Sequence, residues 1–313
     1  MDEKDFGLEQ GLKELKKLIP LSAQQLDEAS CKAIADKAES VYEKYSGSEE
    51  PALAYAKILF NLSIQQTELN ELEASVAKIQ SLQERFSDSS IIAEAYAKIL
   101  VGLSIQQTEL QEWEASVAKL QSLQERFSDS PEIAKAYAIA LINLSIQQTE
   151  LQELEASVAK IQSLQECFSD SPKIAEAYAM ALLNLSAQQT ELNELEITVA
   201  KIQSLQERFS DSPEIAKAYA MALVKLSIQQ TEFTELGVAV EKLQALHEHF
   251  QKSEIIAFIY GVFLASLFEQ QTEIDERLQT IETIKKLYEQ FSTFMLQTLY
   301  FPFYLRLSIP VDT

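Results

Sequence analysis

The chain repeats itself every 41 residues. Residues 130–170 and residues 171–211 differ at only nine of 41 positions. A period between about 20 and 50 residues is typical of solenoids, in which similar units stack and bury one continuous core. The repeat therefore predicts a stack of similar units instead of a single globular core. A pair of adjacent glutamines marks the same place in every unit, beginning at Gln24, Gln65, Gln106, Gln147, Gln188, Gln229 and Gln270.

Each unit predicts two amphipathic helices. In the first half, which we call helix A, apolar residues recur at the spacing of one helix face, and Ser130 with Pro131 forms a typical helix start. The second half, helix B, carries another apolar stripe, and Thr149, or Asn70 and Asn193 in sister units, is expected to cap its first turn. Neither helix can hide its apolar face alone, so each is expected to pack on the next unit. The predicted core of one unit is Ile133, Ala134, Tyr137, Ala138, Leu141 and Leu144 in helix A and Leu154, Val158, Ile161, Leu164 and Phe168 in helix B.

The similarity between units divides the chain into four parts. Residues 1–49 are predicted to form a divergent N-terminal capping repeat, because the outer face of a terminal unit meets water. Residues 50–252 hold five near-identical repeats, and residues 253–291 form a divergent last repeat. Residues 292–313 are apolar with polar interruptions and are predicted to form a capping helix or tail. A disordered tail, a partner-binding segment and an exposed apolar end are the alternatives for these last residues.

The unit resembles the tetratricopeptide repeat, and most closely the longer class whose period is about 42 residues. The resemblance rests on Tyr137 in helix A, Ala156 early in helix B, Phe168 near its end and Pro131 at the turn between units. It covers about residues 50–291, although Ala or Leu replaces the family's glycine in helix A. The resemblance implies an all-α, right-handed α-solenoid of about seven helix-turn-helix repeats, with an inner groove lined by helix A.

A stripe of side chains opposite the core of helix A faces the groove that the resemblance implies. It mixes amides and apolar residues, which suit an extended or helical peptide because amides can bond a peptide backbone and methionine adapts to varied side chains. The same residues are also consistent with simple packing of one helix A on the next. The candidate groove residues are Lys57, Asn61, Lys98, Ile139, Asn143, Met180, Asn184, Met221 and Lys225, and the stripe ends at Ile64, Ile105, Ile146, Ala187 and Ile228.

Charges on helix A alternate in sign from one unit to the next. One position reads Glu94, Lys135, Glu176 and Lys217, and the position three residues before it reads Glu132, Lys173 and Glu214. Equivalent positions in adjacent units lie side by side, so opposite charges are expected to meet across successive A helices as well as at i, i+3 within one helix. We interpret this as a device that fixes registry, since a slip by one repeat would bring like charges together.

The composition excludes several classes of function. The formal net charge is −22 and basic residues are scattered singly, so binding to DNA or RNA is not expected. The first residues are unlike a secretory signal and the apolar tail is too short and interrupted to span a membrane, which indicates a cytoplasmic protein. The two histidines and two separate cysteines, Cys31 and Cys167, form no metal or catalytic pattern, so neither enzyme activity nor a cofactor is expected.

These features together predict a non-catalytic scaffold that binds a protein or peptide, in an extended form or with a basic surface that the acidic chain would attract. The acidic excess is also consistent with a role in keeping an apolar stack soluble. A structural array that self-associates through its terminal repeats, especially the apolar C-terminal segment, into dimers or filaments is an alternative. An expanded array with little specific binding is a third interpretation.

Overall fold

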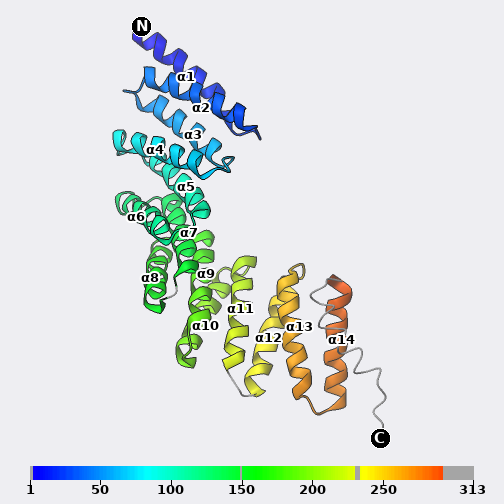
Figure 1. Cartoon of the computed structure of the whole chain (residues 1–313). Helices are drawn as coiled ribbons and strands as arrows, with labels where there is room; N and C mark the ends of the chain where they lie inside the picture. The colour runs from blue at the N-terminus through cyan, green and yellow to red at the C-terminus, as the bar shows by residue number, and fades with distance from the viewer. Residues whose placement is uncertain (1–2, 149, 230–232, 292–313) are drawn as a thin grey trace. The chain divides into compact units, whose positions relative to one another are not determined.

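The structure is a computed structural model that describes residues 3–148, 150–229 and 233–291. These residues form fourteen α-helices, two in each 41-residue period, as the sequence predicts (Figure 1). The predicted capping helix or tail at 292–313 lies outside the described residues. The helices are α1 (Glu3–Ser22), α2 (Glu28–Lys44), α3 (Glu49–Ser63), α4 (Leu69–Arg85), α5 (Ser90–Gln106), α6 (Leu110–Arg126), α7 (Pro131–Gln147), α8 (Leu151–Cys167), α9 (Pro172–Gln188), α10 (Leu192–Arg208), α11 (Pro213–Gln229), α12 (Phe233–His249), α13 (Glu254–Gln270) and α14 (Ile274–Phe291).

The chain divides into two compact units. Unit 1 comprises Met1–Thr149 with Ala159–Ile174, and unit 2 comprises Glu150–Val158 with Ala175–Thr313. Within unit 1, α1 contacts α3, α3 contacts α5 and α5 contacts α7, so each helix A packs directly on the next. Helices α2, α4 and α6 pack against the A helices on both sides of them in the chain. Unit 2 repeats this pattern, because α11 contacts both α12 and α13.

The apolar stripes form the core that the sequence predicts. All six predicted residues of helix A, from Ile133 to Leu144, are buried. Helix B buries Leu154, Val158, Ile161 and Leu164, whereas Phe168 follows the helix and is half-buried. Burial of these side chains is the main favourable term in the stability of the stack.

Helix A begins as predicted, but helix B does not. Ser130 caps α7 by accepting a hydrogen bond from the Ile133 N–H at 3.3 Å, and Pro131 opens the helix. Helices α4 and α10 begin after Glu68 and Glu191, and neither cap makes a side-chain bond. The prediction that Asn70 and Asn193 cap helix B is therefore wrong, since both lie inside their helices. Thr149 lies outside the described residues.

The glutamine pair holds the turn that precedes helix B. Ser75 Oγ, in the second turn of α4, donates a hydrogen bond to Gln66 Oε1 at 2.9 Å, which closes the turn between α3 and α4. Gln106 Nε2 of the following repeat donates to the Gln66 carbonyl oxygen at 3.0 Å and ties the turn to its neighbour. The same contacts join Ser116 to Gln107, Thr280 to Gln271 and Gln229 to the Gln189 carbonyl.

These bonds also explain which small residue helix B buries. The tetratricopeptide resemblance emphasises Ala156, but this side chain is exposed. Ser157, the next residue, is buried, and Ser75 and Ser116 occupy the equivalent position. Ser75, Ser116 and Thr280 supply a hydroxyl donor at this position, whereas Ala239 occupies it in α12 and packs as a simple small residue.

A second set of polar contacts joins consecutive repeats and was not predicted. Gln121 Oε1 on α6 accepts hydrogen bonds from Tyr137 Oη at 3.2 Å and from Lys160 Nζ at 3.3 Å. Gln121 Nε2 donates to Glu125 at 2.9 Å. One amide therefore links a helix B to the helix A that follows it and to the next helix B. Gln80 and Gln203 make the equivalent contacts with Tyr96 and Lys119 and with Tyr219 and Lys242.

Candidate interaction surface on the A helices

The structure places the candidate groove residues on the A helices of both units. In unit 1, Lys57 and Asn61 lie on α3, Lys98 on α5, and Ile139 and Asn143 on α7, and these three helices contact one another in sequence (Figure 1). In unit 2, Met180 and Asn184 lie on α9, and Met221 and Lys225 on α11.

The amide groups of this surface are used inside the protein. Asn61 Nδ2 on α3 donates hydrogen bonds to the Ile19 carbonyl oxygen at 3.3 Å and to Ser22 Oγ at 3.0 Å, both on α1. Asn143 Nδ2 on α7 donates to Ser104 Oγ on α5 at 3.4 Å. These asparagines tie each helix A to the preceding one. They favour the packing interpretation for this position, because the N–H groups expected to bind a peptide already have partners.

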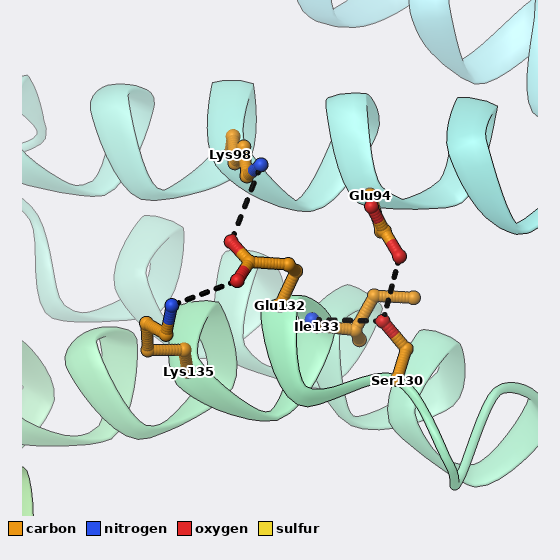
Figure 2. A network of polar contacts seen from close by, with 6 residues as sticks. All are labelled: Glu94, Lys98, Ser130, Glu132, Ile133 and Lys135. Carbon is orange, nitrogen blue, oxygen red and sulfur yellow. Dashed lines mark hydrogen bonds and ion pairs between the residues drawn. The ribbon is translucent and has the colours of Figure 1, made fainter. Parts of the chain in front are cut away.

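Lys98 is also engaged within unit 1. Its Nζ lies 3.3 Å from Glu132 Oε2 on α7 (Figure 2). The same Nζ lies 5.8 Å from the centre of the Phe60 ring on α3. Glu132 accepts a second bond from Lys135 Nζ at 2.8 Å, one turn along the same helix. The two ammonium groups, Lys135 first, hold the pKa of Glu132 below its ordinary value although partial burial opposes the shift.

The alternating charges form the expected i, i+3 pairs within a helix, but across the A helices Glu94 meets a helix cap instead of a lysine. Glu94 does not reach Lys135; its Oε1 accepts from the hydroxyl of Ser130, the cap of α7, at 3.0 Å (Figure 2). Lys135 turns back to Glu132 because the i, i+3 spacing on one helix brings them together. In unit 2, Ser212 donates to Glu176 at 3.2 Å and Lys217 pairs with Glu214 at 3.0 Å in the same way. The contacts that cross from one helix A to the next therefore involve helix caps as well as opposite charges.

The surface leaves several apolar side chains exposed. Ile139 in unit 1 is 36% exposed and Met221 in unit 2 is 47% exposed. The residues at the C-terminal end of the stripe are more exposed still: 69% for Ile64, 66% for Ile105, 61% for Ile146 and 74% for Ile228. The sequence places these isoleucines at the end of the stripe, but helical periodicity alone does not show that they remain exposed in the fold.

A small cavity of about 200 Å³ lies between α1 and α3 in unit 1. Leu12 and Leu53 contribute apolar walls, and Lys16 and Lys57 flank them. Lys16 occupies in α1 the position that Lys57 has in α3. The N-terminal part of the surface is therefore cationic, whereas Ile139 brings an apolar side chain to the same position on α7.

Reactive side chains are sparse in the described part of the chain. His247 is half-buried with its ring 5.9 Å from that of Tyr260, and burial lowers its pKa. His249 is exposed and lies 3.3 Å from Asp211. Cys31 and Cys167 are free thiols. Among residues 3–148, 150–229 and 233–291, no three His, Cys, Asp or Glu side chains gather as a metal site would require. No helix within the same ranges has the length and apolar character needed to cross a bilayer.

Comparison with known proteins gives likenesses of fold. No protein-family model matches the chain, and no curated protein sequence matches it. Similar solved structures include a tetratricopeptide repeat protein from Parabacteroides merdae, with 12% identity and a TM-score of 0.47 over 92% of this chain and 98% of that one. Yeast Tom70 shows 14% identity and a TM-score of 0.46 over 100% of this chain and 66% of its own.

A human IFIT1 dimer with m7Gppp-AAAA is a third similar structure, with 11% identity and a TM-score of 0.40 over 98% of this chain and 70% of that one. The assignment of the fold rests on the helices themselves. Fourteen described helices follow one another in pairs with a period of 41 residues, and each helix A of unit 1 packs on the next. This arrangement makes the chain a tetratricopeptide-like helical repeat protein.

Proposed function

We propose that the chain is a non-catalytic scaffold that binds a protein or peptide on the exposed face of its A helices. The observation that carries this proposal is that polar and apolar side chains on that face differ in whether they have partners inside the protein. Its amides and several of its charges have partners inside the protein, whereas Ile139, Met221 and the isoleucines at the helix ends remain exposed. Single exposed apolar residues are ordinary on a protein surface, but a repeated set on contacting helices is typical of an interaction site.

Capture of partners from an extract of the source cells tests the proposal. The immobilised chain would be compared with a face variant, Ile139→Glu with Met221→Glu, and a control variant, Ile197→Glu with Val238→Glu. The control residues lie on α10 and α12, which are B helices, and are 60% and 52% exposed. Their replacement therefore removes a similar apolar area. A partner that the face variant loses and the control keeps, with equal helicity in both, would support binding on the A helices. Retention of every partner by the face variant would contradict it.

Self-association is a second candidate, favoured by one feature of unit 2. Ile274 and Leu278 on α14, the last described helix, are 74% and 54% exposed. Two copies would have to overcome mutual repulsion, since each carries a formal net charge of −22. Light scattering of the wild type and of the Ile274→Gln, Leu278→Gln variant at low and high salt distinguishes the two candidates. A wild-type dimer that the variant lacks would support self-association, and a wild-type monomer in both salts would exclude it.

A further inference from the structure

Ile64, Ile105 and Ile146 form a row of exposed side chains in unit 1, which we call the isoleucine row. They occupy one position in three successive repeats, near the C-terminal ends of α3, α5 and α7. Because α3 contacts α5 and α5 contacts α7, the row crosses three neighbouring helices. Each side chain is more than three-fifths exposed, so packing within the chain does not account for its apolar character.

The turns that follow the row expose carboxylates and no cations. Glu68 and Glu109 each follow an isoleucine of the row by four residues and are exposed. No lysine or arginine occurs between Ile64 and Lys78 or between Ile105 and Lys119. The glutamines of these turns are occupied by the contacts with Ser75, Ser116 and the neighbouring repeat. This edge of unit 1 therefore offers a partner apolar contact and negative charge.

The spacing of the row favours a helix as its partner. Helices in contact lie about 8–10 Å apart, so consecutive isoleucines are separated by roughly that distance. Residues seven apart in an α-helix rise by about 10.5 Å and stay close to one face. An extended strand covers the same distance in about three residues, but three steps turn the side chain to the opposite side. A helix with apolar residues at i, i+7 and i+14 can thus meet all three isoleucines, whereas a regular strand cannot.

We propose that the isoleucine row docks an amphipathic helix of another protein, with apolar residues at heptad spacing and lysine or arginine beside them. Charge complementarity selects this occupant over a second copy of the chain, because the row is flanked by carboxylates and the chain is strongly acidic. The inference rests on the proposed function and specifies the partner of one part of that surface.

Synthetic peptides test the proposal directly with the full chain. The probe is a helical peptide of about 18 residues with leucine at i, i+7 and i+14 and flanking lysines on an alanine and glutamine background. One control peptide has the leucines moved off the heptad positions, and a second has glutamate in place of lysine. The row variant is Ile64→Gln, Ile105→Gln, Ile146→Gln. The matched variant is Ile197→Gln, Ile274→Gln, Leu278→Gln, which removes three exposed apolar side chains from unit 2.

The heptad lysine peptide is expected to bind the wild type and the matched variant alike in fluorescence anisotropy, and the row variant at least about tenfold more weakly. A tenfold loss corresponds to about 1.4 kcal/mol. The interaction should also weaken with salt, because its electrostatic part is exposed. Circular dichroism would establish that both variants remain folded.

Equal affinity for the shifted-leucine peptide, or unchanged binding to the row variant, would overturn the proposal, as would absence of binding to the wild type. If the peptide were lost only from the Ile139→Glu, Met221→Glu variant, binding on the A helices would stand and the isoleucine row would not be its site. The capture experiment judges the wider proposed function independently of the peptides.

Discussion

An alanine substitution should stabilise the chain at one helical glycine, Gly102, but not at another, Gly11. Gly102 lies within α5, and a Cβ added there meets no atom within 4 Å. Gly11 lies within α1, and an added Cβ would overlap Cε2 of Tyr45 and lie 2.7 Å from its Cδ2. Real Cβ atoms do not approach other heavy atoms so closely, so Gly11→Ala requires the Tyr45 ring to move. The same chemical change therefore relaxes one helix and disrupts the packing of another.

The magnitudes follow from helix propensity and overpacking. Alanine is about 0.8–1.0 kcal/mol more favourable than glycine inside a helix, so Gly102→Ala should stabilise the chain by up to that amount. Forcing an extra carbon into a packed site costs about 1–3 kcal/mol, which at Gly11 exceeds or cancels the gain in propensity. We therefore expect Gly11→Ala to be neutral at best and to destabilise the chain by about 2 kcal/mol at worst.

Urea unfolding followed by the helical circular dichroism signal would measure both effects. Each should appear as a shift of the unfolding midpoint with the slope unchanged. The Tyr45→Ala background is the decisive control, since removing the ring should turn Gly11→Ala into a stabilising change. Gly237→Ala in α12 is a second control, because an added Cβ there also meets nothing within 4 Å. If Gly102→Ala destabilised the chain, or if the effect of Gly11→Ala were the same with and without Tyr45, the reasoning would be refuted.

Three further predictions concern buried polar groups. Burial raises the pKa of Tyr96, Tyr137 and Tyr219 from 10.0 to about 12. The stability that these hydroxyl groups contribute is therefore complete below pH 10 and should be lost as the pH rises towards about 12. Urea midpoints and phenolate absorbance measured together check this, and phenolate formation without loss of stability would contradict it. Burial lowers the pKa of His247, so stability should fall as the pH drops below its ordinary value of 6.5, and His247→Phe should flatten this dependence in the urea midpoint. Ser116→Ala should cost about 1–3 kcal/mol of unfolding free energy because it leaves Gln107 Oε1 without its donor, whereas Ala at the exposed Ser122 should cost little; equal costs would refute the role of the glutamine turn.

The core could be predicted from the sequence because burial and helical periodicity give the same pattern. Ile133, Tyr137 and Leu141 are spaced for one face of a helix, and this face must pack against another helix to remove these side chains from water. The start of α7 could be predicted because Ser130 and Pro131 act on local backbone groups. These features depend on neighbours in the chain, which a single unit of sequence contains.

The contacts between repeats could not be predicted in the same way. Whether Glu94 meets Lys135 or Ser130 depends on how α7 is rotated and shifted against α5, and the periodicity of one helix leaves both open. The sequence shows that Asn61 and Asn143 lie on the stripe, which suits a peptide partner. It does not show which oxygen of the neighbouring helix each amide reaches. The recurring glutamine pair was a signal for such contacts, since a polar pair kept in every repeat needs a partner that also recurs.

Differences between neighbouring repeats show how such a scaffold can change its binding surface without changing its core. Of the nine positions that differ between residues 130–170 and 171–211, only Ser157 is buried, and its counterpart Thr198 keeps the hydroxyl. Ile139 and Ile146 on the A helix become Met180 and Ala187. Substitution at exposed positions that share no partner usually has small and additive effects on stability. Each repeat can therefore present its own side chains on a common core, which is why the isoleucine row can span three consecutive repeats and give way to alanine at the next.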